Sequence, residues 1–329
     1  MPSIKDVAKH AGVSVTTVSR VLNNKGYISQ QTRLKVEEAM KELDYFPNQI
    51  ARALLKNQSF VLGVIVPDLS HPFFAELINW IEHTATVNNY KILVCNSLQE
   101  AEKEAKYINM LKQNRVDGII MCSHSQEVEA YRNVGMPIVS FDRIISSSIP
   151  YVASDNFRGG DIATEHLIDQ GCRKLLYISG PLNNNLLANR RGDAFQLRSM
   201  NAGVEWKILE GAHIKATFED NWKFIEQNLD GYLGEYDGIF CSNDIMAYTL
   251  YIYAKEKGIQ VPDQLKIIGY DYHSYTRMLK EPLLTTIKQP IESMGKMLCN
   301  SLIEQVEKRG VEETNNFVFD VELIKGNTT

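Results

Sequence analysis

Short apolar runs alternate with longer helical stretches from residue 60 onward, and this alternation constrains the fold more than any other feature of the chain. An apolar run without polar interruption is typical of a parallel strand that is covered on both faces. Seven runs have this character, at 60–66, 90–95, 116–121, 137–141, 174–179, 236–241 and 265–270. Helical stretches separate or follow them at 73–88, 100–113, 158–170, 189–201, 244–257 and 291–308. The order predicts right-handed βαβ units.

The length of this region indicates more than one packed unit. From residue 60 to the last residue the chain has 270 positions, which exceeds the most common domain length of about 100–150 residues. The candidate strands also fall into two sets around residue 160. We therefore expect two α/β lobes with a cleft between them.

The charge distribution separates the first 58 residues from the rest. The whole chain has 35 Lys and Arg against 40 Asp and Glu, a net charge of -5. Residues 1–58 hold nine basic and five acidic side chains, or +4, so the remainder carries -9. A small basic unit on a large acidic body indicates a module that binds a polyanion, joined to a body with another task.

The basic unit has the pattern of three short helices. Ser3 followed by Asp6 forms a capping box for a helix that runs to about Lys9, and Gly12 ends it. Ser14 can cap a second helix, from Val15 to about Leu22. Its inward residues would be Val18, Val21 and Leu22, and its outward residues Val15, Thr16, Ser19 and Arg20. Ser29 precedes a third helix, from Gln30 to about Leu43. Two helices joined by a glycine-containing turn indicate a helix-turn-helix.

A fourth helical pattern follows Pro47. It spans about nine residues, from Asn48 to Lys56, and isolated helices shorter than about 12–15 residues are marginal in water. We expect this segment to be disordered until something packs against it.

Motifs for catalysis, cofactors and metals are absent. The chain has no glycine-rich phosphate loop, no H-E-x-x-H and no G-x-S-x-G, although an enzyme without such a motif is not excluded. Its five cysteines form no C-x-x-C pair, and its seven histidines show no metal-ligand spacing. We therefore predict a protein that is not an enzyme and that has no cofactor and no metal. Without a signal peptide or a long apolar stretch, it should be cytoplasmic.

The first 60 residues contain the motifs D-V-A-K-H-A-G-V-S-V-T-T-V-S-R-V-L-N, S-Q-Q-T-R, Y-F-P-N and A-R-A-L. These motifs resemble the DNA-binding segment of the lactose repressor and galactose repressor (LacI/GalR) family of bacterial regulators. The resemblance continues in the body through H-P-F-F-A-E-L, V-D-G-I-I, F-D-R, D-N, F-C-S-N-D-I-M-A, I-I-G-Y-D and L-T-T-I-K-Q-P. It covers nearly the whole chain.

This resemblance implies a domain order. An all-α helix-turn-helix DNA-binding domain (1–46) and a hinge helix or linker (47–58) would precede an effector-binding and dimerisation domain (59–329). The last would be an α/β, two-lobed domain like the periplasmic binding proteins, with three crossovers between its lobes. Its N-lobe would comprise about 59–158 and 290–320, and its C-lobe about 159–289 and 321–329.

The resemblance also implies DNA-contacting residues. On the recognition helix, Val15, Thr16 and Arg20 would enter the major groove, with Arg20 suited to guanine. In the hinge, Leu54 would wedge into the minor groove and kink the duplex, while Asn48 and Arg52 would anchor that helix. Further positions that contact phosphates or flank the base contacts are Ser14, Thr17, Ser19, Asn23, Ser29, Thr32 and Ala51. For Thr17, Ser29 and Thr32, plain helix capping is the alternative, and Leu54 has the alternative of packing on the body.

For the cleft, the resemblance implies seven effector-binding residues: Phe73, Asp142, Arg191, His213, Asn243, Asp271 and Gln289. Carboxylates, amides and a guanidinium suit the vicinal hydroxyls of a polyol. Arg190 is an alternative to Arg191, and Asp244 is expected to be a helix cap. His213 replaces an aromatic residue that is frequent in the family, and Ala194 replaces a glycine.

The expected function is a repressor of carbohydrate-utilisation genes, similar to sucrose or ribose repressors. It would be a nucleoid-associated homodimer on a pseudo-palindromic operator, controlled by a small carbohydrate effector, either a sugar or a sugar phosphate. The chain ends without a heptad repeat, which favours a dimer over a tetramer. The effector could either release or strengthen DNA binding. Alternatives are a global catabolite regulator, with a phosphorylated carrier protein as co-repressor, and a free sugar-binding protein.

Overall fold

The computed structural model describes most of the chain. The described residues are 2–22, 26–45, 58–123, 135–182, 186–211, 217–231, 233–279, 281, 283–308 and 315–329. The chain divides into two compact units, Met1–Ser59 and Phe60–Thr329. We call them the head and the body.

The head consists of three helices around a small apolar core. They are α1 (Ile4–His10), α2 (Val15–Leu22) and α3 (Gln30–Glu42), close to the predicted bounds. Val7, Val18 and Val36 are fully buried at the centre of this core. At the start of α1, the Asp6 carboxylate accepts hydrogen bonds from the backbone N–H and hydroxyl of Ser3, each at 2.7 Å.

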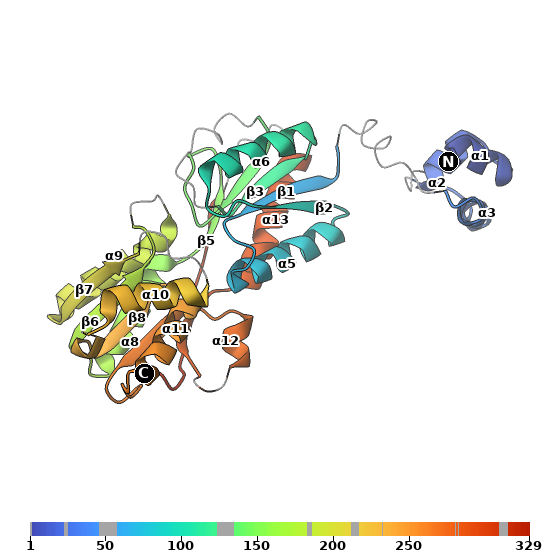
Figure 1. Cartoon of the computed structure of the whole chain (residues 1–329). Helices are drawn as coiled ribbons and strands as arrows, with labels where there is room; N and C mark the ends of the chain where they lie inside the picture. Colours follow the sequence, from blue (N-terminus) through green and yellow to red (C-terminus); the bar gives the residue numbers. More distant parts are fainter. Residues whose placement is uncertain are drawn as a thin grey trace. The chain divides into compact units, whose positions relative to one another are not determined.

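The body contains the two predicted α/β lobes (Figure 1). The N-lobe has a six-stranded parallel sheet in the order β11-β5-β4-β3-β1-β2. Its strands are β1 (Val61–Val66), β2 (Lys91–Asn96), β3 (Gly118–Met121), β4 (Ile138–Phe141), β5 (Tyr151–Ser154) and β11 (Phe317–Phe319). The helices packed on this sheet are α5 (Pro72–Val87), α6 (Ala101–Gln113) and α13 (Ile291–Glu307). Helices α5 and α13 lie side by side (Figure 1).

The C-lobe repeats this architecture. Its sheet has the order β12-β10-β9-β8-β6-β7, and only the β10–β12 pair is antiparallel. The strands are β6 (Lys174–Ser179), β7 (Glu205–Glu210), β8 (Gly238–Cys241), β9 (Lys266–Asp271), β10 (Thr285–Lys288) and β12 (Glu322–Ile324). The α-helices are α8 (Asn156–Asp169), α9 (Arg190–Ala202), α10 (Phe218–Leu229), α11 (Asp244–Glu256) and α12 (Ser274–Met278), with 3-10 turns η1 (Leu187–Asn189) and η2 (Leu233–Glu235).

The chain passes between the two sheets three times. It leaves the N-lobe sheet after β5 and enters α8, which packs on α9 of the C-lobe. It returns between β10 and α13, and crosses once more between β11 and β12.

Five strands were absent from the seven sequence predictions, namely β5, β7, β10, β11 and β12. The last two have three residues each: the exposure of β11 alternates, and β12 has one exposed and two half-buried residues. Strand β7 also alternates between exposed and half-buried positions because it lies at the edge of its sheet. Strands β5 (Tyr151–Ser154) and β10 (Thr285–Lys288) lie inside their sheets but are short and contain polar residues, whereas the edge strand β2 was predicted. A search for continuous apolar runs therefore misses short or polar strands, wherever they lie in the sheet.

The five cysteines, Cys95, Cys122, Cys172, Cys241 and Cys299, are all buried and unbridged. Within the described residues, no helix is both long enough and apolar enough to cross a membrane.

The close packing of α13 on α5 yields a stability prediction. A Cβ atom on Gly295 of α13 would lie 2.7 Å from the Trp80 Cβ and 3.1 Å from the Leu77 carbonyl oxygen. Gly295→Ala should therefore lower the free energy of unfolding of the body by about 1–2 kcal/mol, because overpacking outweighs the gain in helix propensity. Urea denaturation followed by circular dichroism measures this.

Gly234→Ala is the matched control, since nothing lies within 4 Å of the added Cβ atom, and its effect should stay within about 0.5 kcal/mol. If Gly295→Ala instead raised the stability, α13 would not approach α5 as closely as described.

Candidate functional site

A cavity of about 210 Å³ lies between the two lobes of the body. Its polar walls come largely from the carboxyl ends of parallel strands. Asp142 directly follows β4, Asp271 ends β9, and Asn243 lies two residues after β8. Ligands of open α/β sheets characteristically bind at these strand ends. The cavity is therefore the best candidate site for a small ligand.

Six of the seven predicted effector residues line this cavity together: Phe73, Asp142, Arg191, Asn243, Asp271 and Gln289. The seventh, His213, lies outside the described residues. Of the two candidate arginines, Arg191 lines the cavity. The guanidinium of Arg190 lies instead over the ring of Phe157, 5.3 Å from its centroid.

Arg191 is held on three sides. Its Nε donates to Asn156 Oδ1 at 2.7 Å, and one terminal nitrogen donates to the Ser242 carbonyl oxygen at 2.9 Å. The guanidinium carbon also lies 3.5 Å from the centroid of the Tyr270 ring, within cation–π range. Two of the five guanidinium N–H groups are used in these bonds. Within the described part of the chain, the others remain for a ligand.

Asp142 connects this arginine to the opposite lobe. Asn156 donates through Nδ2 to Asp142 Oδ1 at 2.6 Å while it accepts from Arg191, so one amide bridges both charged groups. Burial raises the pKa of Asp142 to about 6, although nearby Arg191 and the hydrogen bond from Asn156 oppose this shift. Asp142 also has a positive φ of 52°, which is uncommon outside glycine and is frequent at functional sites.

Asp271 forms the second acidic position. Gln289 donates to Asp271 Oδ1 at 2.7 Å, and its own amide oxygen accepts from the Ser154 hydroxyl at 2.7 Å. Burial raises the pKa of Asp271 well above its usual value, with Arg191 opposing the shift. The residue also has a strained φ of 118°. Gln289 and Ser154 lie at crossovers, so the Asp271 carboxylate is fixed where the lobes join.

The prediction that Asp244 is a helix cap is wrong. The N-cap of α11 is Asn243, whose side chain accepts from the backbone N–H of Met246 at 2.9 Å. Asp244 is fully buried and accepts from the hydroxyls of Thr276 and Thr286, each at 2.5 Å. Its burial raises its pKa to about 7. Asp244 therefore anchors α12 and β10 behind the cavity wall, and Asn243 has two tasks, as cap and as lining.

An apolar wall completes the cavity. Phe73, Phe74 and Phe141 pack against one another, with the Phe73 and Phe141 ring centroids 5.6 Å apart. Acidic and amide groups on one side and aromatic carbon on the other suit a ring compound that carries several hydroxyl groups.

On the head, α2 has an exposed face of the expected composition. Val15 is 41% exposed, and Thr16 and Arg20 are exposed beside it, while Ser19 is half-buried. The Thr17 backbone N–H donates to the Ser14 hydroxyl at 3.1 Å, and the Thr32 N–H donates to Ser29 at 3.3 Å. The hydroxyls of Ser14 and Ser29 therefore act as helix caps, which was the alternative expected for Ser29. The hydroxyls of Thr17 and Thr32 each lie 2.8 Å from the capping hydroxyl.

The remaining predicted DNA contacts lie outside the described residues. They are Asn23, Asn48, Ala51 and Leu54, together with Arg52 and most of the 47–58 hinge.

Comparisons with protein families identify both units. Residues 3–48 match the description "Bacterial regulatory proteins, lacI family", and residues 59–326 match "Periplasmic binding proteins and sugar binding domain of LacI family". The chain belongs to the LacI family. The predicted fold class, a helix-turn-helix head with a two-lobed body like the periplasmic binding proteins, is confirmed.

Relatives resemble the chain over its whole length. The sucrose operon repressor of Pediococcus pentosaceus is 38% identical over 327 residues, covering 99% of both chains. The ribose operon repressor of Halalkalibacterium halodurans is 38% identical over 330 residues, covering 100% of this chain and 97% of its own.

Solved structures of the family agree with the fold. A periplasmic binding protein/LacI regulator from Alkaliphilus metalliredigens, complexed with D-xylulofuranose, is 33% identical with a TM-score of 0.74. It covers 82% of this chain and 98% of its own. The lac repressor dimer bound to operator and the anti-inducer ONPF is 25% identical with a TM-score of 0.84. It covers 99% of this chain and 98% of its own.

Sequence reasoning assigned no role to Asn156, Ser154 or Tyr270, which hold the charged cavity residues of this LacI-family protein in place. The D-N motif at 155–156 was part of the resemblance and provided the one signal for Asn156. In the sequence, Tyr270 is one more residue of an apolar run that predicts a buried strand. Its contact with Arg191 therefore has no sequence signature.

The raised pKa of Asp142 yields a prediction about stability. An unfolded Asp titrates near 3.9, so between about pH 4 and pH 6 the folded state holds a proton that the unfolded state releases. Stability is then lost as the pH rises through this window. Asp142→Asn removes this loss and should be more stable than the wild type at pH 8, by about 3 kcal/mol. Near pH 4 the two proteins should be equally stable.

Urea denaturation at both pH values measures the difference, with the exposed Ser147→Ala as a control that should match the wild type throughout. A gain for Asp142→Asn of the same size at pH 4 and pH 8 would show that the Asp142 carboxylate is not the cause.

Proposed function

We propose that the protein is a sequence-specific repressor of a carbohydrate-utilisation operon, controlled by a small uncharged sugar that binds between the lobes of the body. The observation that carries this proposal is the cavity in which Asp142, Arg191 and Asp271 converge. The same chain has a helix-turn-helix head of the LacI family. It acts as a cytoplasmic, nucleoid-associated homodimer on a pseudo-palindromic operator, and it is not an enzyme.

DNA recognition is assigned to the exposed face of α2. Its Arg20 can donate two hydrogen bonds to the major-groove edge of a guanine, and Val15 and Thr16 can contact thymine methyl groups. Phosphate contacts are assigned to the hydroxyl side chains near the helix starts and to the hinge residues. The acidic body would repel a phosphate backbone, which leaves the basic head as the DNA-binding surface.

The charges of the cavity favour an uncharged ligand. Arg191 is the one Lys or Arg among the described lining residues, and it already has Asp142 and Asp271 near it. A phosphate group would therefore meet two acidic side chains without a cation of its own. Vicinal hydroxyl groups, in contrast, can donate to the carboxylates and accept from the guanidinium.

The size of the cavity favours a single sugar ring. Its volume of about 210 Å³ lies below the range of about 300–1,000 Å³ that holds drug-sized ligands. The relatives are named for both a disaccharide and a pentose, sucrose and ribose, and one solved structure holds D-xylulofuranose. The small cavity favours the single ring among these. A pentose, or a monosaccharide of similar size, fits best.

Control of DNA binding would follow from lobe closure. A ligand that contacts both lobes stabilises one relative arrangement of them, and it shifts the population by its differential affinity. In a dimer, this shift would change the spacing of the two hinge segments and therefore the insertion of Leu54 into the operator.

The role of Arg20 can be tested on DNA. Arg20→Ala should lose about 1–3 kcal/mol of discrimination at one base pair of the operator, because its bidentate contact reads one base. Fluorescence anisotropy with operator and single-substitution duplexes measures this discrimination. Lys41→Ala removes an exposed charge at the end of α3 and serves as the control, which should weaken all duplexes alike. Equal weakening of all duplexes by Arg20→Ala would make Arg20 a phosphate contact only.

The cavity assignment can be tested with sugars. D-Ribose, D-xylulose, D-fructose and sucrose should be compared with D-ribose 5-phosphate and D-fructose 6-phosphate by thermal shift. An uncharged monosaccharide should raise the melting temperature of the wild type by a few degrees at saturation, and the phosphates should not. Arg191→Ala and Asp271→Ala should abolish this shift while the unliganded variants still bind the operator.

The neighbouring Arg190→Ala is the matched control and should respond like the wild type, because Arg190 lies over Phe157 outside the cavity lining. Loss of the response in Arg190→Ala with retention in Arg191→Ala would contradict the assignment. If no sugar acts on the wild type while a phosphorylated carrier protein strengthens DNA binding, the catabolite-regulator function replaces the proposed one.

A further inference from the structure

Helices α8 and α9 each begin at the cavity and each carries a residue that holds the site together. Asn156 is the first residue of α8, and Arg191 is the second residue of α9. The hydrogen bond from Arg191 Nε to Asn156 Oδ1 is therefore a contact between the starting turns of two helices. Its length depends on how far α9 is displaced along α8.

The two helices approach each other closely next to this bond. A Cβ atom on Gly160 of α8 would lie 2.4 Å from the Arg191 carbonyl oxygen and 2.8 Å from its Cα atom. The backbone of Arg191 thus rests directly on α8. A small slide of α9 would move the guanidinium by the same amount, because no flexible side chain lies between the two backbones.

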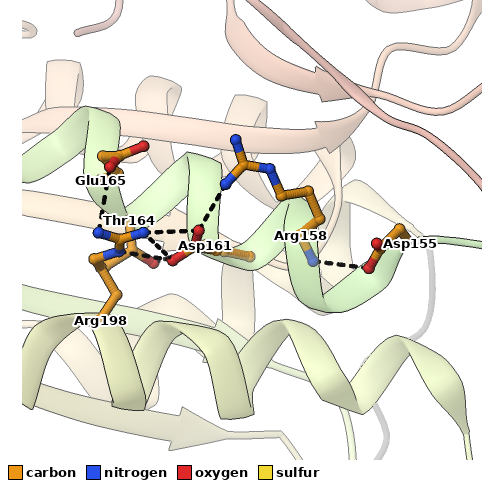
Figure 2. Close-up of polar contacts among 7 residues, drawn as sticks. Asp155, Arg158, Asp161, Thr164, Glu165 and Arg198 are labelled. Atoms are coloured by element: carbon orange, nitrogen blue, oxygen red, sulfur yellow. Dashed lines mark hydrogen bonds and ion pairs between the residues drawn. The ribbon is translucent and has the colours of Figure 1, made fainter.

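A second polar contact joins the same helices further from the cavity (Figure 2). Arg198, seven residues after Arg191, donates to both carboxylate oxygens of Asp161, at 2.6 and 2.8 Å. Arg158 binds the same carboxylate at 2.9 Å, and Arg198 also contacts Glu165 at 3.2 Å. Figure 2 shows the Asp161 carboxylate between the Arg158 and Arg198 side chains, with Glu165 next to Arg198.

This network constrains its side chains more than an isolated ion pair on the surface does. Isolated exposed ion pairs contribute about 0–1 kcal/mol, with bidentate arginine pairs and networks as the exceptions. The Asp161 side chain is 17% exposed and the Arg198 side chain 34%. The hydrogen bond from Arg198 is the main cause that lowers the pKa of Asp161, so the carboxylate stays ionised and paired near neutral pH.

We propose that Asp161 and Arg198 are positioning residues for the effector site, which fix α9 on α8 so that Arg191 stays on Asn156. This inference rests on the proposed function of the cavity. The packing of α9 on α8 at Gly160 and the Arg191–Asn156 bond lie near the helix starts, and the Asp161–Arg198 contact adds a polar constraint further along the pair. Loss of the outer contact lets the inner bond lengthen, and Asn156 then no longer bridges Arg191 and Asp142.

The first test needs no effector. In the full chain labelled with ¹⁵N, the hydrogen exchange rate of the Arg191 Nε–H group is measured by NMR, with Arg191→Lys to assign its signal. Arg198→Met keeps an aliphatic side chain of similar length and removes the guanidinium group, and Asp161→Asn removes the negative charge. Each should accelerate the exchange about tenfold, as expected for groups coupled through one network. Arg198→Lys keeps the charge without the bidentate geometry and should give an intermediate rate.

Lys257→Met is the matched control, because it removes an ion pair of 2.7 Å with Asp230 in the same lobe, at the end of α11 and away from the cavity lining. It should leave the exchange rate unchanged. A purely structural role for Arg198 would lower the melting temperature of Arg198→Met without accelerating the Arg191 exchange. That result would overturn the proposal, and Asp161→Asn decides the question if Arg198→Met does not fold.

The second test uses the sugar that gives the largest thermal shift among D-ribose, D-xylulose, D-fructose and sucrose. Arg198→Met should weaken its binding about tenfold in the wild-type background. In an Arg191→Lys background the same change should have little further effect, because Arg198 acts through Arg191. Additive losses would contradict the proposal. If none of these sugars binds the wild type, the proposed effector class is wrong, while the exchange experiment still decides whether Asp161 and Arg198 position Arg191.

Discussion

The buried guanidinium of Arg191 is the group on which the arrangement of the cavity depends. A charge removed from water is costly unless it is paired and hydrogen-bonded, and Arg191 meets this requirement through Asn156, the Ser242 carbonyl group and the ring of Tyr270. Asp142 and Asp271 in turn depend on Arg191, because it is the nearby positive charge that opposes the effect of their burial. Removing the arginine would leave two buried carboxyl groups without a counter-ion.

The topology explains why these charges come from distant parts of the sequence. Parallel strands end at one edge of each sheet, and the crossovers bring the two edges to face each other. Asn156 and Gln289 lie next to two crossovers, where a side chain can reach groups of both lobes. A ligand in the cavity therefore contacts residues whose relative positions change when the lobes move, which is the requirement for coupling between a ligand and a domain motion.

Much of the architecture follows from the sequence because central parallel strands and amphipathic helices have strong signatures. Strand β6 and helix α9 were predicted to within one residue at each end. Strand β7 was missed because polar residues break its apolar run, and the short strands β5 and β10 were missed although they lie inside their sheets. A strand of four residues that includes polar side chains has too little local pattern to be found, and the neighbouring strands of the sheet decide that it forms.

Only part of the candidate site could be predicted from the sequence, for a related reason. Residue types and the family resemblance pointed to Asp142, Arg191 and Asp271, which the structure brings together. Neither indicated that Asn156 bridges two of them, or that Asp244 is buried among threonine hydroxyls instead of capping α11. Such roles arise from tertiary contacts between residues that are about 14–42 positions apart, and no local spacing encodes them.

The burial that disfavours the ionised form of Asp142 also favours the binding of a polyol in the cavity. Water is displaced when a ligand fills a cavity of this size, and in the drier surroundings a hydroxyl donor stabilises an ionised carboxylate more strongly than it would in bulk solvent. A hydroxyl group of the ligand can thereby take over part of the solvation that Asp142 lost on folding. The positive φ angles of Asp142 and Asp271 aim both carboxyl groups from strand ends at some cost in backbone strain. The fold thus accepts desolvation and strain at two acidic residues, and hydrogen bonds from a polyol would offset part of the desolvation.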